Sequence, residues 1–326
     1  MKTFAEKLNN WYKADHRDLP FRHTKDPYQI WVSEVMARQT RIESMLPYYE
    51  KWMALWPTVE DLAQAQIEDV LHVWQGLGYY NRARKLHEGA LMICEKYGGQ
   101  MPCSKEELLS IPGIGAYTAG AIMSICFNEK VPAVDGNVLR VISRHDLIEE
   151  DVSAQKTQRL IYDIVEERME EPCVFTQALM ELGARVCTPK SPSCLLCPLM
   201  DTCLACELNA QADYPHKKPK KKPLELNLHT YVIVWDNQVL ISTDDSDGLM
   251  KGLVRLPQFS EALNVDGELM GQATHVFSHR VWKMNVVLVE KQVDVQSCFW
   301  WPVDRLDELS MVTAHRKILK KQFGLQ

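Results

Sequence analysis

The chain has 326 residues, 46% of them hydrophobic and 25% charged, with a formal net charge of −6 at pH 7. This length and composition predict about two domains with well-formed apolar cores. The absence of any run of roughly 18 uninterrupted apolar residues excludes a membrane span, and the first seven residues lack the apolar core of a secretory signal. A cytosolic protein is therefore expected. The acidic net charge leaves a nucleic-acid partner open, because binding needs only a local positive face.

The first two hundred residues predict helices. Apolar residues recur at helical spacing in segment 4–12 and again in segment 62–74. Ser104 and Glu107 have the spacing of a capping box ahead of an apolar pair. Because strand-like alternation is scarce here, residues 1–208 are predicted to form a mostly α-helical domain.

Glu34 lies inside this helical region, in the strongly apolar segment 30–36. A carboxyl group on such a helix is partly withdrawn from water, which disfavours its charge and raises its pKa. It can then donate a proton near neutral pH. Amphipathic helices also carry acidic residues along their polar edge, so a surface role for Glu34 stays open at this point.

Segment 111–115 reads Ile-Pro-Gly-Ile-Gly and is expected to join two helices, the second running from Tyr117 to Phe127. Gly113 and Gly115, on either side of one apolar residue, predict a tight turn whose amide groups can donate to a phosphate. The N-terminal end of the second helix adds positive potential. An ordinary helix–helix turn fits the same letters, so both interpretations remain open.

Asp135 ends the apolar stretch 131–134 and stands at the predicted start of a helix. An aspartate there can be an N-cap without any catalytic role. Together with Glu34, however, it completes the pair that N-glycosidic cleavage requires. One acid protonates the leaving base, and one carboxylate stabilises the oxocarbenium-like sugar. The pair indicates this chemistry more strongly than either residue alone.

Four of the ten cysteines stand in one window with the spacing C-x6-C-x2-C-x5-C. Disulfides are disfavoured in a reducing compartment, and four thiolates on one loop can enclose a zinc or an iron–sulfur centre. One short C-x2-C knuckle with longer arms favours a cuboidal cluster over zinc, and unligated cysteines are the remaining alternative. Nearby Cys206 leaves the identity of the fourth ligand open. The predicted ligands are Cys187, Cys194, Cys197 and Cys203.

The composition changes after residue 208. Segment 209–227 carries five lysines broken by Pro219 and Pro223, which predicts a solvated linker; a plain spacer and transient phosphate contact are both open. Residues 228–326 are expected to form a second, α+β domain. Its expected elements are strands at 229–235, 238–243, 276–290 and 298–301, a hairpin turn at 236–237 and a helix at 312–323.

In combination these features resemble the endonuclease III superfamily of DNA glycosylases, where a helix-hairpin-helix, a Val-Asp-Gly-Asn segment and a cysteine loop of this spacing occur together. Segments 33–36, 76–80 and 135–137 are similar to the adenine DNA glycosylases within it. Segment 275–279, His-Val-Phe-Ser-His, resembles the loop with which they read 8-oxoguanine. The resemblance covers nearly the whole chain, and the combination is specific although each piece alone is not.

The resemblance implies a fold and a reaction. The fold is an all-α helix-hairpin-helix glycosylase domain with an iron–sulfur cluster loop, followed by an α+β Nudix-like domain that reads the lesion. The reaction is removal of adenine mispaired with 8-oxoguanine or guanine in double-stranded DNA, by a monomeric enzyme with a 4Fe-4S cluster. The chain has no G-x5-E…R-E-x-x-E-E signature, so pyrophosphatase activity is not expected.

The resemblance also assigns roles by position. Glu34 would protonate the flipped adenine at N7. Asp135 would stabilise the cationic sugar, with a transient covalent adduct as one route, and Tyr117 and Asn137 would orient that step. Lyase members have a lysine at position 117 that forms a Schiff base with the sugar, so the phenol predicts a monofunctional enzyme. The remaining assignments are Arg22 and Gln177 at the adenine pocket, Gln39, Thr40 and Tyr79 at the duplex, Gly113 and Gly115 at phosphates, and Phe277, Ser278 and His279 at 8-oxoguanine.

Three departures from the family pattern concern specificity. Phe21 replaces the usual tryptophan after Leu-Pro, Arg38 brings a charge close to the lesion, and segment 252–257 lacks the usual tryptophan. They leave open a glycosylase for another damaged base. A lesion-binding protein without catalysis is the third hypothesis, against which Glu34 and Asp135 argue.

Overall fold

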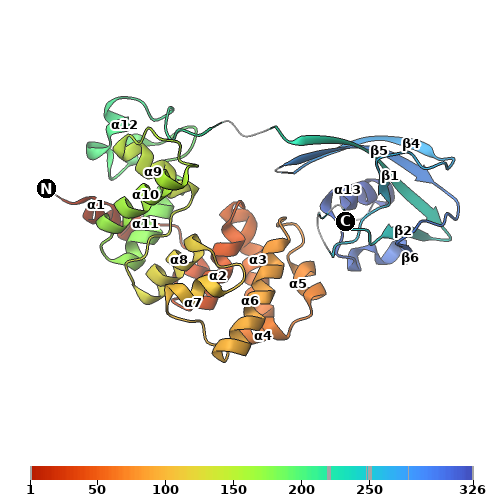
Figure 1. Cartoon of the computed structure of the whole chain (residues 1–326), viewed down its shortest axis with the longest axis horizontal. Helices are drawn as coiled ribbons and strands as arrows, with labels where there is room; N and C mark the ends of the chain where they lie inside the picture. Colours follow the sequence, from red (N-terminus) through yellow and green to blue (C-terminus); the bar gives the residue numbers. More distant parts are fainter. Residues whose placement is uncertain (1, 219–221, 247, 249–251, 278, 325–326) are drawn as a thin grey trace. The chain divides into compact units, whose positions relative to one another are not determined.

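The computed structural model describes residues 2–218, 222–246, 248, 252–277 and 279–324. The chain divides into two compact units, Met1–Ala65 with Lys85–Pro219 and Gln66–Arg84 with Lys220–Gln326 (Figure 1). The break after Pro219 lies inside the segment expected to be a linker, whereas nothing in the sequence indicates the grouping of 66–84 with the C-terminal residues. The domain limits 1–208, 209–227 and 228–326 stay predictions.

The first unit is helical, as predicted (Figure 1). Several helices begin at local signals: Thr3 and Glu6 form a capping box, and the Ser104 hydroxyl accepts the Glu107 amide at 3.3 Å. None of the described helices combines the length and the apolar character that a membrane crossing needs. The helices are α1 (Phe4–Ala14), α2 (Pro27–Ala37), α3 (Ile42–Leu55), α4 (Val59–Gln64), α6 (Asn81–Tyr97, its first turn in the second unit), α7 (Lys105–Ser110), α8 (Ala116–Phe127), α9 (Gly136–Asp146), α10 (Gln155–Arg168), α11 (Pro172–Arg185) and α12 (Leu204–Glu207), with 3-10 turns η1 (Pro20–Arg22), η2 (Cys194–Leu196) and η3 (Met200–Thr202).

Helix α11 is central to the packing of this unit, because it contacts α1, α8 and α9. It buries Phe175 and Leu182, and each such side chain contributes about 1.5–3 kcal/mol. At Gly183 a Cβ atom would lie 2.6 Å from the Cβ of Asn137, so glycine is what lets α9 approach α11 this closely. Helix α2 packs against α3 and α8, and α2 and α8 are both buried over most of their residues.

The second unit contains α5 (Ile67–Val73), a mixed six-stranded sheet and α13 (Thr313–Phe323). The strand order is β4-β5-β1-β2-β6, with β3 also paired to β1. The β1–β5 pair is parallel and the other named pairs are antiparallel. The sheet and helix confirm the predicted α+β class. The bounds are β1 (Leu224–Trp235), β2 (Gln238–Ser242), β3 (Gln258–Phe259), β4 (Glu268–Val276), β5 (Arg280–Val289), β6 (Cys298–Pro302) and η4 (Val303–Glu308).

The predicted turn at residues 236–237 is confirmed. Both residues have positive φ, 48° and 57°, and join antiparallel strands β1 and β2, as a type I′ hairpin requires. The predicted strand 276–290 is wrong at its start, because the Phe277 amide donates to the Arg280 carbonyl at 2.8 Å and reverses the chain between β4 and β5. Strand β4 itself was not predicted; its residues are partly or fully exposed, so it lacks an apolar alternation.

Candidate active site

Glu34 lies on α2, a helix with a strong local start. The Asp26 carboxylate accepts a backbone amide of the first turn, and Pro27 occupies the first helical position; both are typical of a helix N-terminus. The helix buries every residue from Ile30 to Met36. The Glu34 side chain is therefore enclosed, with 9% of the residue exposed, in agreement with the expectation from its apolar segment.

Tyr117, on the first turn of α8, holds Glu34. Its hydroxyl donates to the Glu34 Oε2 at 2.5 Å and also contacts the sulfur of Met180 at 3.8 Å. Burial raises the pKa of Glu34 to about 7, while this hydrogen bond opposes the rise and the negative charge of Asp135 adds to it. Burial also raises the pKa of Tyr117 well above its usual value, so the phenol stays a donor. The Glu34 carboxyl is thus poised to exchange a proton near neutral pH.

Asp135 is the N-cap of α9. Its Oδ1 accepts the amides of Asn137 and Val138 at 2.8 Å each, and its Oδ2 accepts the Asn137 side-chain amide at 2.8 Å. Burial raises the pKa of Asp135, and these donors oppose the rise because they favour the anion. The N-cap role of Asp135 is therefore confirmed, and its catalytic role stays a prediction.

The two carboxyl groups share one electrostatic environment. The charge of Asp135 acts on Glu34, and both charges act on Tyr117. Tyr117 and Asp135 keep part of their surface exposed. The hypothesis of N-glycosidic cleavage requires the carboxyl groups of Glu34 and Asp135 to lie in one such environment.

Arg22 and Gln177 are linked through Tyr12. The Arg22 guanidinium carbon lies 5.3 Å from the centre of the Tyr12 ring, and the Tyr12 hydroxyl donates to the Gln177 Oε1 at 3.1 Å. Arg22 also donates to the buried Glu181 at 2.5 Å. Burial alone would raise the pKa of Glu181, but hydrogen bonds from Arg17 and Arg22 lower it to about 2. A fixed carboxylate thus orients Arg22 beside Tyr12.

The residues expected at the duplex differ from the pocket residues in their exposure. Gln39 and Tyr79 both have positive φ, 60° and 49°, a conformation uncommon outside glycine and often found at functional positions. Gln39 is exposed and Tyr79 is 50% exposed. Thr40 follows Gln39, and its hydroxyl donates to the Arg38 carbonyl at 3.4 Å.

The two hairpin glycines have different conformations. Gly113 has a φ of +87°, and a Cβ there would lie 2.9 Å from the Cβ of Lys85. Gly115 is the N-cap of α8 with a φ of −100° and has open space where a Cβ would be. Gly113 is therefore required by the turn, whereas Gly115 leaves the N-terminus of α8 uncovered.

In the second unit, the predicted lesion-reading residues lie between β4 and β5. The Phe277 ring packs edge-on against His275 and Trp282, with ring centroids 4.6 and 4.7 Å apart. The His279 carbonyl accepts the Leu224 amide at 3.0 Å. Ser278 lies outside the described residues.

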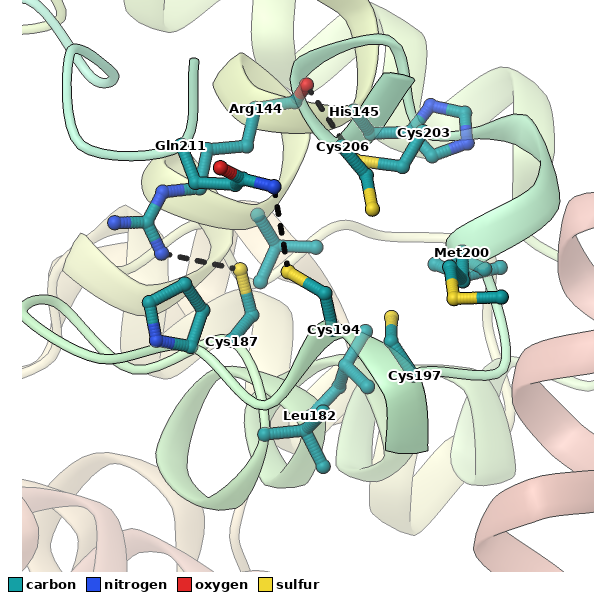
Figure 2. A pocket seen from close by; sticks show the side chains of 14 residues that line it. Arg144, His145, Leu182, Cys187, Cys194, Cys197, Met200, Cys203, Cys206 and Gln211 are labelled. Atoms are coloured by element: carbon teal, nitrogen blue, oxygen red, sulfur yellow. Dashed lines mark hydrogen bonds between the residues drawn. The ribbon is translucent and has the colours of Figure 1, made fainter. Parts of the chain in front are cut away.

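The four predicted cysteine ligands line one cavity. Figure 2 shows them around this space together with Cys206. Arg144 braces the loop by donating to the Cys187 sulfur at 3.4 Å and the Thr188 carbonyl at 2.7 Å. Among the described residues, no three His, Cys, Asp or Glu side chains meet as a ready-made site for a single metal ion. Soft sulfur donors gathered on one short loop suit an iron–sulfur group.

Sequence reasoning missed Arg140, Arg144 and Glu181, buried charged residues that contact the predicted site residues and the cysteine loop. Arg140 donates to the Asn137 Oδ1 at 2.9 Å and to the Cys187 carbonyl at 2.8 Å. Arg140 thereby connects Asn137, which donates to Asp135, with Cys187, the first cysteine of the loop. Its spacing from Asn137, one helical turn, was the only available signal.

The chain matches two family models. Residues 32–167 match the HhH-GPD superfamily base excision DNA repair protein model, and residues 229–321 match the NUDIX domain model. The first match spans α2 to α10 and includes Glu34, Tyr117 and Asp135. The second covers most of the sheet of the second unit and most of α13.

Among relatives, an adenine DNA glycosylase from Buchnera aphidicola of Schizaphis graminum is 30% identical over 340 residues, which cover 98% of each chain. An adenine DNA glycosylase from Rattus norvegicus is 43% identical over 214 residues, 62% of this chain and 42% of the relative. The match thus spans less than half the length of the rat protein. The solved structure of a thermostable thymine-DNA glycosylase is 28% identical with a TM-score of 0.56, and the match covers 63% of this chain and 95% of that one.

Proposed function

The chain belongs to the adenine DNA glycosylase family, and on this premise we propose that it hydrolyses the N-glycosidic bond of adenine mispaired with 8-oxoguanine or guanine in double-stranded DNA, acting in base excision repair. One observation carries the proposal. A buried glutamic acid with a pKa near 7 shares one environment with an aspartate whose anion is stabilised by hydrogen bonds.

Glu34 is the general acid. In its neutral form it protonates N7 of an adenine that has been flipped out of the duplex, which makes the base a better leaving group. Tyr117 holds the carboxyl through Oε2 and leaves Oε1 for the substrate. This acid step contributes typically 10²–10⁴ in rate.

Asp135 stabilises the cationic sugar that forms as the bond breaks. Its two oxygens are already fixed by donors from Asn137 and Val138, so no reorganisation is needed when positive charge develops beside them. Because position 117 is a phenol and offers no amine for a Schiff base, the enzyme removes the base without cutting the strand.

The adenine pocket is formed by Arg22 and Gln177, whose side chains are held by Glu181 and Tyr12. Gln39, Thr40 and Tyr79 contact the duplex, and the amides around Gly113 and Gly115 bind backbone phosphates. In the second unit Phe277, Ser278 and His279 contact 8-oxoguanine, and that unit binds the lesion without pyrophosphatase activity. We propose that the enzyme acts as a monomer.

Cys187, Cys194, Cys197 and Cys203 hold a 4Fe-4S cluster with a structural role. When bound, the cluster cross-links the loop 187–203. Arg144 and Arg140 support this loop from α9 by their bonds to Thr188 and to the Cys187 carbonyl. Iron and sulfide at about four each per chain are expected, and stoichiometric zinc in their place would exclude the cluster.

Three duplexes test the substrate: adenine opposite 8-oxoguanine, adenine opposite guanine and a duplex with a different damaged base. Release of adenine from the first, and more slowly from the second, is expected. Release only from the third would identify a glycosylase for another lesion. Tight binding to the first duplex without release would identify a lesion-binding protein.

The Glu34→Gln variant tests the acid. It keeps the shape of the side chain, so it is expected to bind the lesion duplex as the parent does while its single-turnover rate falls roughly 10²–10⁴-fold. A rate near that of the parent would refute the role of Glu34.

A further inference from the structure

The cysteine cavity holds one more thiol than the predicted ligand set. Cys206 lines the same cavity as the other four cysteines (Figure 2). Its thiol lies beside the same space as that of Cys194 (Figure 2). The remaining described cysteines, Cys94, Cys103, Cys126, Cys173 and Cys298, do not line this cavity.

Cys203 and Cys206 lie on one helical turn. Cys203 is the N-cap of α12, and its carbonyl accepts the Cys206 amide at 3.0 Å. Residues three apart on a helix face the same side, so both thiols point toward the cavity from one short segment. The Cys203 thiol donates to the Arg144 carbonyl at 3.7 Å, which gives it a partner when it is protonated.

We propose that Cys206 is an alternative fourth ligand of the cluster and exchanges with Cys203. The inference rests on the proposed 4Fe-4S cluster. In the exchange a Cys206 sulfur–iron bond forms as the Cys203 sulfur–iron bond breaks. The proton leaves the Cys206 thiol and ends on Cys203, whose thiol then donates to the Arg144 carbonyl, and the iron keeps its oxidation state. Cys187, Cys194 and Cys197 stay in place.

The test compares the full-length parent with Cys203→Ala, Cys206→Ala and the double variant, because alanine, unlike serine, supplies no oxygen ligand. The readouts are iron and sulfide per chain and the visible absorbance of the cluster. Each single variant is expected to keep at least about half of the parent's iron, and the double variant less than about a tenth. Cys203→Ala combined with Cys298→Ala is the matched control, since Cys298 lies in the second unit, and it is expected to behave as Cys203→Ala alone.

The possible outcomes distinguish failure of the proposed ligand exchange from failure of the proposed cluster. A parent without iron overturns the cluster. A parent with about four irons whose Cys203→Ala variant is as empty as the double variant overturns the exchange alone. So does iron lost only in Cys206→Ala, which would make Cys206 the sole fourth ligand.

A second measurement needs no variant. Brief alkylation of the native, iron-loaded parent followed by peptide mass spectrometry reports which of the two thiols is free. Molecules labelled at Cys203 and others labelled at Cys206 are expected. Label at only one of the two positions would contradict the exchange.

Discussion

At Glu34, burial creates the proposed acid and also costs stability. The pKa rises from 4.5 to about 7, which corresponds to about 3 kcal/mol of preference for the neutral form in the folded protein. The folded state therefore binds the proton more tightly than the unfolded state does. The stability associated with this group is fully present below about pH 4.5 and is lost as the pH rises through 7.

This predicts a pH-dependent effect of Glu34→Gln on the free energy of unfolding, because glutamine cannot ionise. Relative to the parent, the variant is expected to gain about 3 kcal/mol between pH 4 and pH 8. Denaturant unfolding at several pH values measures the difference. The control is Glu50→Gln at an exposed position of α3; the same trend in that variant would contradict the assignment.

We predict that Tyr117 helps to set the pH range of the proposed reaction. Its hydroxyl lowers the pKa of Glu34, so Tyr117→Phe is expected to raise that pKa. The parent's rate is expected to fall about tenfold per pH unit above pH 7, and in the variant this alkaline limb moves to higher pH. Single-turnover rates from pH 5 to 9 measure it, with Tyr97→Phe as the control. A limb that stays in place, or moves to lower pH, would show that the hydroxyl does not act on the acid.

Individual site residues differ in how far the sequence predicts them. The apolar neighbours of Glu34 indicate its burial and a raised pKa, but they do not exclude a position on the polar edge of the helix, and the structure decides for burial. Arg140 and Glu181 could not be assigned in this way, because their partners are distant in the chain: Cys187 lies 47 residues from Arg140, and Arg17 lies 164 residues from Glu181. Only the packing of the helices brings them together.

At the scale of elements, the hairpin before α8 offers a matched pair of glycines. Gly113→Ala forces a methyl group into a left-handed turn and against Lys85, which costs about 1–2 kcal/mol. A lower melting temperature is expected. Gly115→Ala meets no protein atom, so its expected cost is only that alanine is a poorer N-cap than glycine, about 0.5–1 kcal/mol.

Affinity for a DNA duplex is a second property in which Gly113→Ala and Gly115→Ala are expected to differ. The methyl group of Gly115→Ala stands where a phosphate would approach the N-terminus of α8, so weaker binding with a smaller loss of stability than in Gly113→Ala is expected. Thermal unfolding and fluorescence anisotropy on the same samples check this. Unchanged affinity in Gly115→Ala would refute the phosphate contact at this glycine.

Local signals also explain which elements the sequence predicts well. The α1, α2 and α7 helices begin at cap residues, and the turn at residues 236–237 follows from its own backbone preference. Strand β4 owes its conformation to pairing with β5 across exposed faces. The sequence of such a strand has no apolar alternation, so the strand can be recognised only from its pairing with β5.

For the whole molecule, we propose that the first unit removes adenine and the second unit recognises the base opposite it. Phe277→Ala removes the ring that packs against His275 and Trp282. Because loss of an aromatic stacking partner costs about 1–3 kcal/mol, the preference for 8-oxoguanine over guanine opposite adenine should fall about tenfold. The rate on the adenine–guanine duplex should be unchanged.

Rates on both duplexes measure this preference. Lys283→Ala on β5 is the control, since that lysine is half-exposed and pairs with Glu225 at 2.6 Å. A loss of rate on both duplexes in Phe277→Ala, or a preference equal to the parent's, would contradict lesion reading by this loop.

Asp135 is both the N-cap of α9 and a proposed catalytic residue. This matters for the design of an inactive variant that captures unrepaired sites in chromosomal DNA. Alanine at this position would strip α9 of its cap at a cost of about 1 kcal/mol, and asparagine would turn an amide nitrogen toward the side-chain amide of Asn137. Position 34 begins no helix. A capture reagent is therefore better made by substituting Glu34, because this removes the activity without removing the cap of a helix.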